Sequence, residues 1–222
     1  NLYAASSQGA TEVGLRGNFI GAPAGGIFSA AADGNVSSFN DDMRSSTGTS
    51  MSTPMGASIT AVIQQMVQDG WFTEDGFVPS GPQLRALLAL SSDSMGESSA
   101  PDAQQGWGRP NLANLIDYDS NASQNIWIHD SYMMNESIRM GMIDDWLSEK
   151  GSRPLEQVIS SQWNGTTAQG PFLAQGENVS WNLTLVPDED LDVFLSFNQR
   201  PFGAVSDDLN VAVVLPNGTR IC

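Results

Sequence analysis

Gly48-Thr49-Ser50-Met51-Ser52-Thr53-Pro54 is the stretch that decides the fold, because it places a serine where a strand-like approach turns into a helix. Gly48 allows a close approach of the backbone, and Pro54 suits a position near a helix start, where its missing N–H costs little. Ser50 is then expected at the positive end of the helix, with its own backbone N–H facing a developing negative charge. A serine in such a place is a candidate nucleophile, provided that a base takes its proton.

The residues on both sides of this stretch fit the same interpretation. The segment 52–68 is apolar around much of its circumference, which predicts a buried helix. Upstream, the segment 27–30 (Ile-Phe-Ser-Ala) reads as a short strand, and the Gly, Ser and Asn of 33–46 predict a surface loop that leads to Ser50. Downstream, the segment 79–90 has a capping serine, a first-turn proline and an apolar run, which predict a second helix.

The motif resembles the serine segment of the subtilase family of serine peptidases, whose pattern is G-T-S-M-x-x-P at the head of a buried helix. One departure is Met55, which stands where many subtilases carry a histidine. Further segments resemble the family in the right order: Ala5 to Gly9, Gly14 to Gly26, Pro79 to Leu90 and Gln105 to Leu112. The resemblance implies an α/β fold, namely the C-terminal part of a subtilisin-like catalytic domain, over residues 1–117.

The pattern changes in the second half of the chain, from Ile126 onward. Apolar residues alternate with polar ones in 181–185, 193–197 and 209–215, which predicts half-buried strands with turns between them. This pattern predicts an all-β sandwich or jelly-roll domain over 118–222. The segment 206–219 resembles a signature of the β-sandwich domain that follows the catalytic domain in some subtilases, whereas 142–160 reads equally well as a short helix or an insertion.

The resemblance implies a catalytic triad in the order Asp, His, Ser, in which Ser50 is the nucleophile. The only histidine, His129, comes after Ser50, and an ordinary surface or interdomain role suits it better than catalysis. No asparagine matches the family's oxyanion-hole asparagine, and no acidic residue before Ser50 stands in the family's D-(S/T)-G context; those residues are Glu12, Asp33, Asp41 and Asp42. We therefore expect a fragment of a subtilase-type serine endopeptidase that holds the nucleophile without its base and is inactive alone.

Two other functions compete with this one. Sedolisin-type serine-carboxyl peptidases share the fold and a similar serine segment, but they use Glu and Asp in place of the histidine base. Met51 and the Asp207-Asp208-Leu209 strand favour the subtilase. A non-catalytic secreted pseudoenzyme or binding protein would retain Ser50 only for its turn geometry.

The charge of the chain limits its partners. A formal net charge of −16 with Lys150 as the only lysine argues against nucleic-acid binding, which needs clustered Lys and Arg. An acidic, lysine-poor surface suits extracellular or saline surroundings, and no apolar run is long enough to span a bilayer. The resemblance adds protein or peptide substrates. From the acidic, lysine-poor composition we expect a secreted protein.

Modification and metal sites are the last features that the sequence suggests. Seven asparagines stand in N-x-(S/T) sequons, which supports secretion: Asn35, Asn121, Asn135, Asn164, Asn178, Asn182 and Asn217. Cys222 is the only cysteine, so no intrachain disulfide forms. The chemistry needs no cofactor. The family resemblance allows structural calcium, although an acidic run such as 188–192 is more often a solvated turn.

Overall fold

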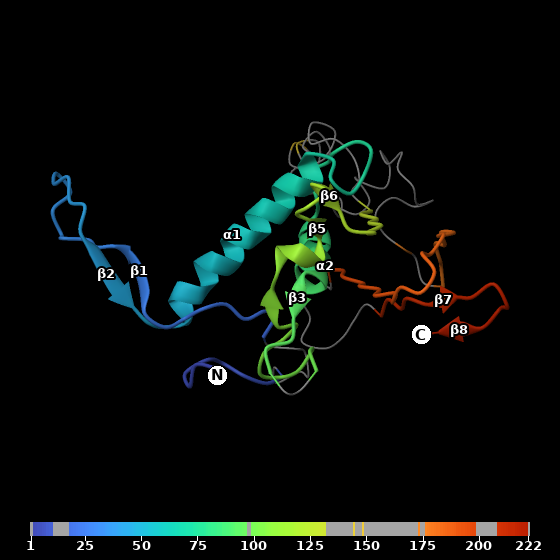
Figure 1. Cartoon of the computed structure of the whole chain (residues 1–222), viewed down its shortest axis with the longest axis horizontal. Coiled ribbons are helices and arrows are strands. Elements are labelled where there is room, and N and C mark those ends of the chain that lie inside the picture. The colour runs from blue at the N-terminus through green and yellow to red at the C-terminus, as the bar shows by residue number, and fades with distance from the viewer. Residues whose placement is uncertain are drawn as a thin grey trace.

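The computed structural model describes residues 2–10, 18–96, 99–131, 176–198 and 208–221, together with the single residues 144, 148 and 173. Two α-helices and four separate two-stranded antiparallel sheets make up the regular structure of these ranges (Figure 1). In chain order the elements are β1 (Ile27–Ala30), β2 (Met43–Ser46), α1 (Thr49–Gln68), α2 (Gly81–Leu90), β3 (Ser92–Asp93), β4 (Arg109–Pro110), η1 (Leu112–Asn114), β5 (Ile116–Asp117), β6 (Ala122–Ser123), β7 (Val213–Val214) and β8 (Arg220–Ile221).

The β1–β2 hairpin projects from the body of the molecule (Figure 1). Its register pairs Ile27 with Ser46 and Ala30 with Met43, and this confirms the predicted strand at 27–30. The predicted surface loop at 33–46 is too long by four residues, because 43–46 pair with β1 as the second strand. Alternation alone could not reveal this strand, since its burial comes from pairing with β1 and only Ser46 is half-buried.

The helix α1 is buried at one end only. Ile63, Met66 and Val67 are buried there, whereas Ala57 and Ala61 are exposed, so the prediction of a buried helix is wrong for its first half. The cause is the position of α2, whose Leu87 and other buried side chains join the core around the C-terminal half of α1. Apolar composition predicts that a helix can be buried, but burial also needs a neighbouring element on each side.

The predicted second helix is confirmed as α2, and its start follows the expected chemistry. The Ser80 hydroxyl accepts a hydrogen bond from the backbone N–H of Gln83 at 3.2 Å, and Pro82 lies in the first turn. The backbone N–H of Ser80 in turn donates to the Asp130 carboxylate at 2.6 Å. This bond connects the start of α2 to a segment 50 residues later, which places Ile128 in the core with Leu87.

Gly106 allows the segment before β1 to pack against the segment before β4. The Trp107 N–H donates to the Phe19 carbonyl at 2.7 Å, and the Gly21 N–H donates to the Gly108 carbonyl at 2.8 Å. Gly106 has φ 62°, and a Cβ there would lie 2.3 Å from the Phe19 carbonyl oxygen. Only glycine permits this conformation and this approach.

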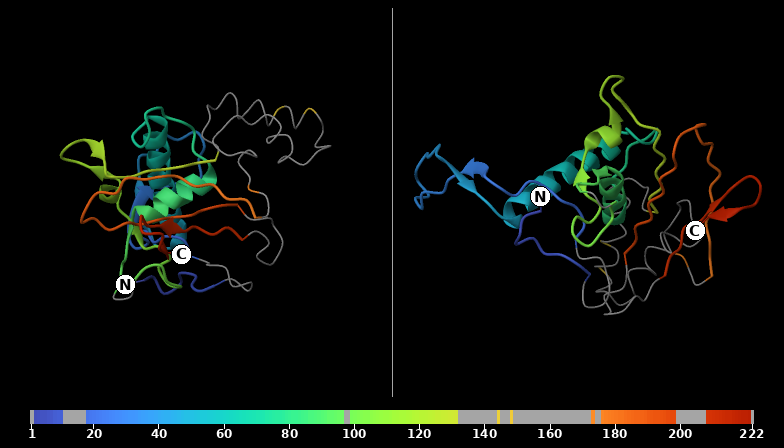
Figure 2. Two further views of the ribbon diagram at one scale, coloured as in Figure 1. Left: turned by 90° about the vertical axis from the view of Figure 1, so that its right-hand side faces the viewer. Right: turned by 60° about the horizontal axis from the view of Figure 1, so that its bottom comes forward.

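The C-terminal part of the described chain contains one hairpin. Val213 pairs with Ile221 across the turn at 216–218, which confirms the turn predicted there. Residues 177–198 form long, extended stretches of chain to which no strand is assigned (Figure 2). The β-sandwich over 118–222 and the boundary at 117 stay predictions, and most of 142–160 lies outside the described residues.

Residues 177–198 nevertheless contact earlier parts of the chain. The rings of Trp107 and Phe194 lie 4.9 Å apart, and Arg85 donates to the Asn198 side chain at 2.9 Å. Asn125 donates to the Glu189 carboxylate at 3.1 Å. Within the described ranges, neither helix combines the length and apolar character that a membrane span requires.

Candidate functional site

Ser50 is the second residue of α1, two positions beyond the cap of the helix. Strand β2 ends at Ser46, and the cap residue Gly48 has φ 153° and ψ 168°. This φ favours glycine, while the space around Gly48 is open enough for a side chain. The predicted turn from strand to helix is therefore confirmed, and Gly48 is needed there for its backbone conformation.

The segment 19–24 holds this turn in place. The Gly48 N–H donates to the Ala24 carbonyl at 2.9 Å, and the Ser52 hydroxyl lies 3.1 Å from the Ala22 carbonyl and 3.0 Å from the Pro23 carbonyl. Because the same segment is bonded to 107–108 through Phe19 and Gly21, the head of α1 is connected to the core. Beyond the resemblance of segments 14–26 and 105–112 to one family, no sequence pattern predicts these contacts.

Ser50 and Ser52 point in different directions. Successive helical residues are rotated by about 100°, so their side chains lie about 200° apart around α1. Ser52 faces the 19–24 segment, whereas Ser50 is exposed on the other side. Ser50 thus presents its hydroxyl to solvent at the N-terminal end of a 20-residue helix, where backbone N–H groups lack intrahelical acceptors.

The sequence predicted Pro54 near the helix start. In the structure Pro54 lies inside α1, as its sixth residue. The helix begins earlier than expected because Gly48 already ends the strand-like approach. A proline at this position has no N–H to donate to the carbonyl of Ser50 four residues earlier. The carbonyl of the candidate nucleophile therefore lacks its regular helical partner.

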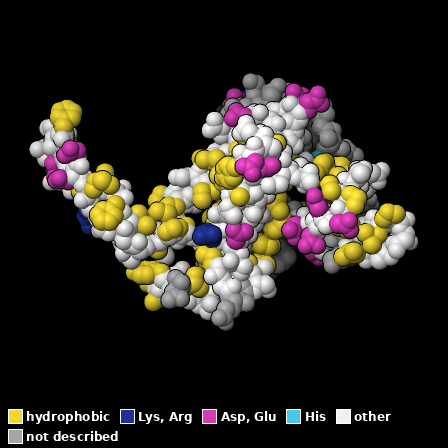
Figure 3. Space-filling model, viewed as in Figure 1, with side chains coloured by type: hydrophobic (Ala, Val, Ile, Leu, Met, Phe, Trp, Pro, Cys, Tyr) yellow, Lys and Arg dark blue, Asp and Glu magenta, His cyan; other side chains and the backbone are white. Residues whose placement is uncertain are grey.

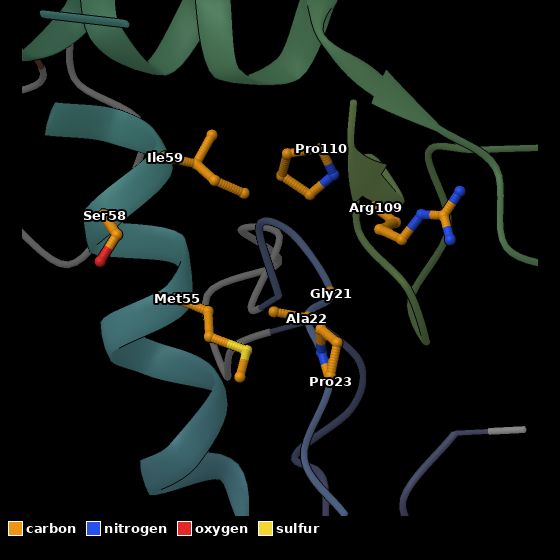
Figure 4. A pocket seen from close by; sticks show the side chains of 8 residues that line it. All are labelled: Gly21, Ala22, Pro23, Met55, Ser58, Ile59, Arg109 and Pro110. Carbon is orange, nitrogen blue, oxygen red and sulfur yellow. The ribbon is translucent and has the colours of Figure 1, made fainter. Parts of the chain in front are cut away.

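A shallow apolar pocket of about 380 Å³ lies beside the first half of α1 (Figure 4). Its walls are Gly21, Ala22, Pro23, Met55, Ser58, Ile59, Arg109 and Pro110. Met55 and Ile59 share the helix face of Ser52, so the pocket opens away from the Ser50 hydroxyl. It can take an apolar group, but it places no acid or base next to Ser50.

In the described part of the chain, no acidic side chain forms a hydrogen bond with Ser50, including those that precede it. Asp33 accepts hydrogen bonds from the Ser38 hydroxyl at 2.5 Å and from the Asn35 N–H at 2.8 Å, and these bonds lower its pKa below the usual aspartate range. Asp33 thus shapes the loop between β1 and β2. Asp41 and Asp42 are exposed on the same loop, and Glu12 lies outside the described residues.

His129 lies far from Ser50, near the C-terminal half of α1. Its neighbour Ile128 packs in the core with Ile63, and the 13 residues from Ser50 to Ile63 correspond to about 20 Å of helix. The His129 ring lies 6.1 Å from that of Trp127 and 4.5 Å from that of Trp181. The structure does not bring the only histidine to the candidate nucleophile.

Burial controls the protonation of His129. Desolvation lowers its pKa below the ordinary histidine value, and the nearby Asp130 carboxylate opposes this shift. Its Nε2 atom is buried and has no hydrogen-bond partner among the described residues. The Trp127 and Trp181 rings also lie 5.5 Å from each other, so the His129 imidazole is one member of a cluster of three rings and serves as a packing group.

A hydrogen-bonded cluster around the Asp93 carboxylate, which the sequence did not single out, lies just after the end of α2. Asp93 accepts hydrogen bonds from the Asn111 and Asn114 side chains at 2.9 and 2.8 Å. The bond from Asn114 and then that from Asn111 lower the Asp93 pKa, with a smaller contribution from Arg109. The cluster fastens β3 to the 3-10 turn η1, so its role is structural.

The described residues contain no group of three or more His, Cys, Asp or Glu side chains that could hold a metal ion. The acidic run 188–192 is exposed, and Asp188 has φ 64° in a turn, as a solvated turn would. Calcium binding stays a prediction. Cys222 lies outside the described residues.

The geometry around Ser50 defines a class of site: an exposed serine at the head of a helix, entered from a short strand through a glycine. Serine peptidases and related acyl-transfer enzymes place nucleophiles at such positions. The model of the Subtilase family matches residues 1–108, a range that includes Ser50, the 19–24 segment and α2. The match supports a serine peptidase of the subtilase kind, with protein substrates. No curated protein and no solved structure matches the chain.

Proposed function

We propose that this chain carries the nucleophile of a subtilase-type serine endopeptidase, and that Ser50 is that nucleophile. The observation that carries the proposal is the G-T-S-M-x-x-P motif, which lies within the range matched by the subtilase model and folds as a strand, a glycine turn and a helix with Ser50 exposed. In the reaction, Ser50 Oγ attacks the carbonyl carbon of a peptide bond while a base accepts its proton.

The backbone N–H of Ser50 is the oxyanion donor that this chain supplies. It lies in the first turn of α1, where N–H groups lack helical acceptors and the helix dipole favours negative charge. As the carbonyl carbon becomes tetrahedral, its oxygen gains negative charge and binds this donor more strongly than the ground state does. A second donor is needed from another residue, since none of the described side chains forms a hydrogen bond with Ser50.

The base is proposed to come from outside this chain, because the only histidine packs against Trp127 and Trp181, and its neighbour Ile128 joins the core around the C-terminal half of α1. The isolated 222-residue chain should then have no catalytic activity. In subtilisin, loss of the histidine lowers turnover by a factor on the order of a million. A fluorophosphonate probe should therefore leave Ser50 of the isolated chain unlabelled, and rapid labelling would refute this part of the proposal.

The function itself is tested in the complete open reading frame that encodes the chain. With casein as substrate, Ser50→Ala should abolish hydrolysis, whereas Thr53→Ala should retain it. Thr53 is a suitable control, because it is also an exposed hydroxyl residue of α1, its hydroxyl donates to the Thr49 carbonyl, and it does not line the pocket. Retained hydrolysis by Ser50→Ala would refute Ser50 as the nucleophile. No hydrolysis by the unsubstituted protein would favour the non-catalytic alternative, in which Ser50 serves turn geometry alone.

Three further properties belong to the same proposal. The protein is secreted, which its acidic, lysine-poor composition and its seven sequons support. Residues 118–222 form a β-sandwich accessory domain, supported by their period-two alternation. Structural calcium would bind exposed carboxylates, and its removal by a chelator would lower the thermal midpoint if it is present.

A further inference from the structure

The sequons of this chain are more frequent than its composition explains. The sequence has 15 asparagines and 37 serines or threonines among 222 residues, so chance pairing would give about 2.5 N-x-(S/T) triplets, against the seven observed. None has proline in the middle position. The excess calls for a structural comparison of where these asparagines lie.

All five sequon asparagines in the described ranges are exposed: Asn35, Asn121, Asn178, Asn182 and Asn217. Three of them occupy equivalent places in the fold. Asn35 lies between β1 and β2, Asn121 between β5 and β6, and Asn217 between β7 and β8. Each of these sheets is a hairpin that projects from the body, as Figures 1 and 2 show. A bulky group attached at such a tip meets no neighbouring element.

At two of these tips, a backbone N–H binds the amide oxygen of the asparagine. The Ser37 N–H donates to Asn35 Oδ1 at 3.1 Å, and the Thr219 N–H donates to Asn217 Oδ1 at 2.9 Å. In both cases the hydroxyl residue of the sequon binds the amide oxygen through its backbone, so the Nδ2 group lies on the opposite side of the amide. Asn121 has φ 52°, the left-handed conformation typical of a tight turn.

Exposed apolar residues stand within four positions of the same three asparagines in the sequence. Val36 and Phe39 are fully exposed next to Asn35, Tyr118 is 67% exposed near Asn121, and Val214 is 66% exposed near Asn217. Figure 3 shows hydrophobic side chains on the surface of the projecting β1–β2 hairpin. A hydrophilic oligosaccharide at each tip would cover side chains that otherwise promote association.

We infer that Asn35, Asn121 and Asn217 are N-glycosylation sites, which shield the three hairpin tips. The donor is an oligosaccharide linked through a diphosphate to a membrane lipid. The amide Nδ2 forms a bond to the anomeric carbon of the sugar, the bond from that carbon to the diphosphate oxygen breaks, the amide loses one proton, and the lipid diphosphate leaves. The inference does not depend on the catalytic role of Ser50.

The test begins with the 222-residue chain secreted from a eukaryotic cell behind a cleavable signal. Digestion with peptide N-glycosidase F in heavy-oxygen water converts each occupied asparagine to labelled aspartate, which mass spectrometry locates. We expect label at positions 35, 121 and 217. Absence of label from any one of the three refutes the assignment of that site, and absence from all three overturns the inference.

Variants separate the sequons from other effects of substitution. Asn35→Gln, Asn121→Gln and Asn217→Gln should each remove one glycan, which is seen as an increase in electrophoretic mobility. Ser37→Ala should remove the same glycan as Asn35→Gln, although Asn35 remains. Asn125→Gln is the matched control, because Asn125 is exposed but stands in no sequon. The triple Gln variant should be secreted several-fold less. Translation with microsomes scores the same mobility shifts where a variant is not secreted; unchanged mobility of the three Gln variants there would also overturn the inference.

Discussion

Replacing Gly106 by alanine should destabilise the chain far more than the same change at Gly26, although the two glycines have nearly the same backbone conformation. Their φ angles are 62° and 63°. A Cβ at Gly26 has no atom within 4 Å, whereas a Cβ at Gly106 lies 2.3 Å from the Phe19 carbonyl oxygen. The pair therefore separates the cost of the left-handed conformation from the cost of the steric overlap.

The expected free energies follow from these two costs. The left-handed conformation costs a non-glycine residue about 1–2 kcal/mol, and alanine recovers about 0.4–1 kcal/mol by restricting the unfolded chain. Gly26→Ala should thus cost about 1 kcal/mol. Gly106→Ala adds about 1–3 kcal/mol of overpacking. It also adds about 1 kcal/mol for the displaced hydrogen bond from Trp107 to Phe19, for a total of about 3–5 kcal/mol.

Urea unfolding followed by tryptophan fluorescence measures both variants. With a denaturant slope of about 2 kcal/mol per molar, Gly106→Ala should unfold at about 1–2 M lower urea than Gly26→Ala. Because Phe19 begins the segment that holds the head of α1, Gly106→Ala should also raise proteolysis near Gly48. Equal midpoints for the two variants would refute the packing of segment 19–21 against 106–108.

Three further substitutions test other parts of the structure. Ser80→Ala should lower the free energy of unfolding by about 1 kcal/mol through loss of the α2 cap, as measured by urea titration, whereas Ser58→Ala should leave it nearly unchanged. The lowered Asp93 pKa means that its hydrogen bonds stabilise the fold above the unfolded pKa of about 3.9 and are lost as the pH falls through the lower folded value. Asp93→Asn should therefore flatten the loss of stability in acid, and an unchanged pH profile would contradict this. The lowered His129 pKa means that stability rises with pH between the folded value and the unfolded value of about 6.5, because the unfolded chain binds the proton first. An NMR titration of this single histidine should give a midpoint below 6.5, and a midpoint above it would contradict the buried neutral ring.

The elements that the sequence predicted correctly are those with local causes. The helix α2 depends on Ser80 and Pro82 at its start, and both contacts lie within one turn. The turn into α1 depends on Gly48, because the φ of 153° favours glycine whatever its partner, and the bond from Gly48 to Ala24 then holds the turn in place. Local chemistry of this kind can be read from the order of residues.

The features that the sequence could not predict have distant causes. The exposure of Ala57 and Ala61 depends on where α2 packs, and the requirement for Gly106 depends on Phe19, 87 residues earlier. The alternating residues 181–185 suit a strand, but a strand also needs a partner at hydrogen-bonding distance, and the described ranges assign none to them. The pattern gives the face that a strand would bury and leaves its partner open.

The exposed face of α1 determines from which side another group can reach Ser50. On a helical projection, Pro54, Ala57 and Ala61 lie within about 40° of Ser50, and all three are exposed and small. Small side chains allow another backbone to approach a helix closely. The 19–24 segment occupies the opposite face through Ser52 and leaves the Ser50 side open. Any group that takes the Ser50 proton must therefore reach it across this small-residue face, and His129, which packs beyond Ile63, cannot do so.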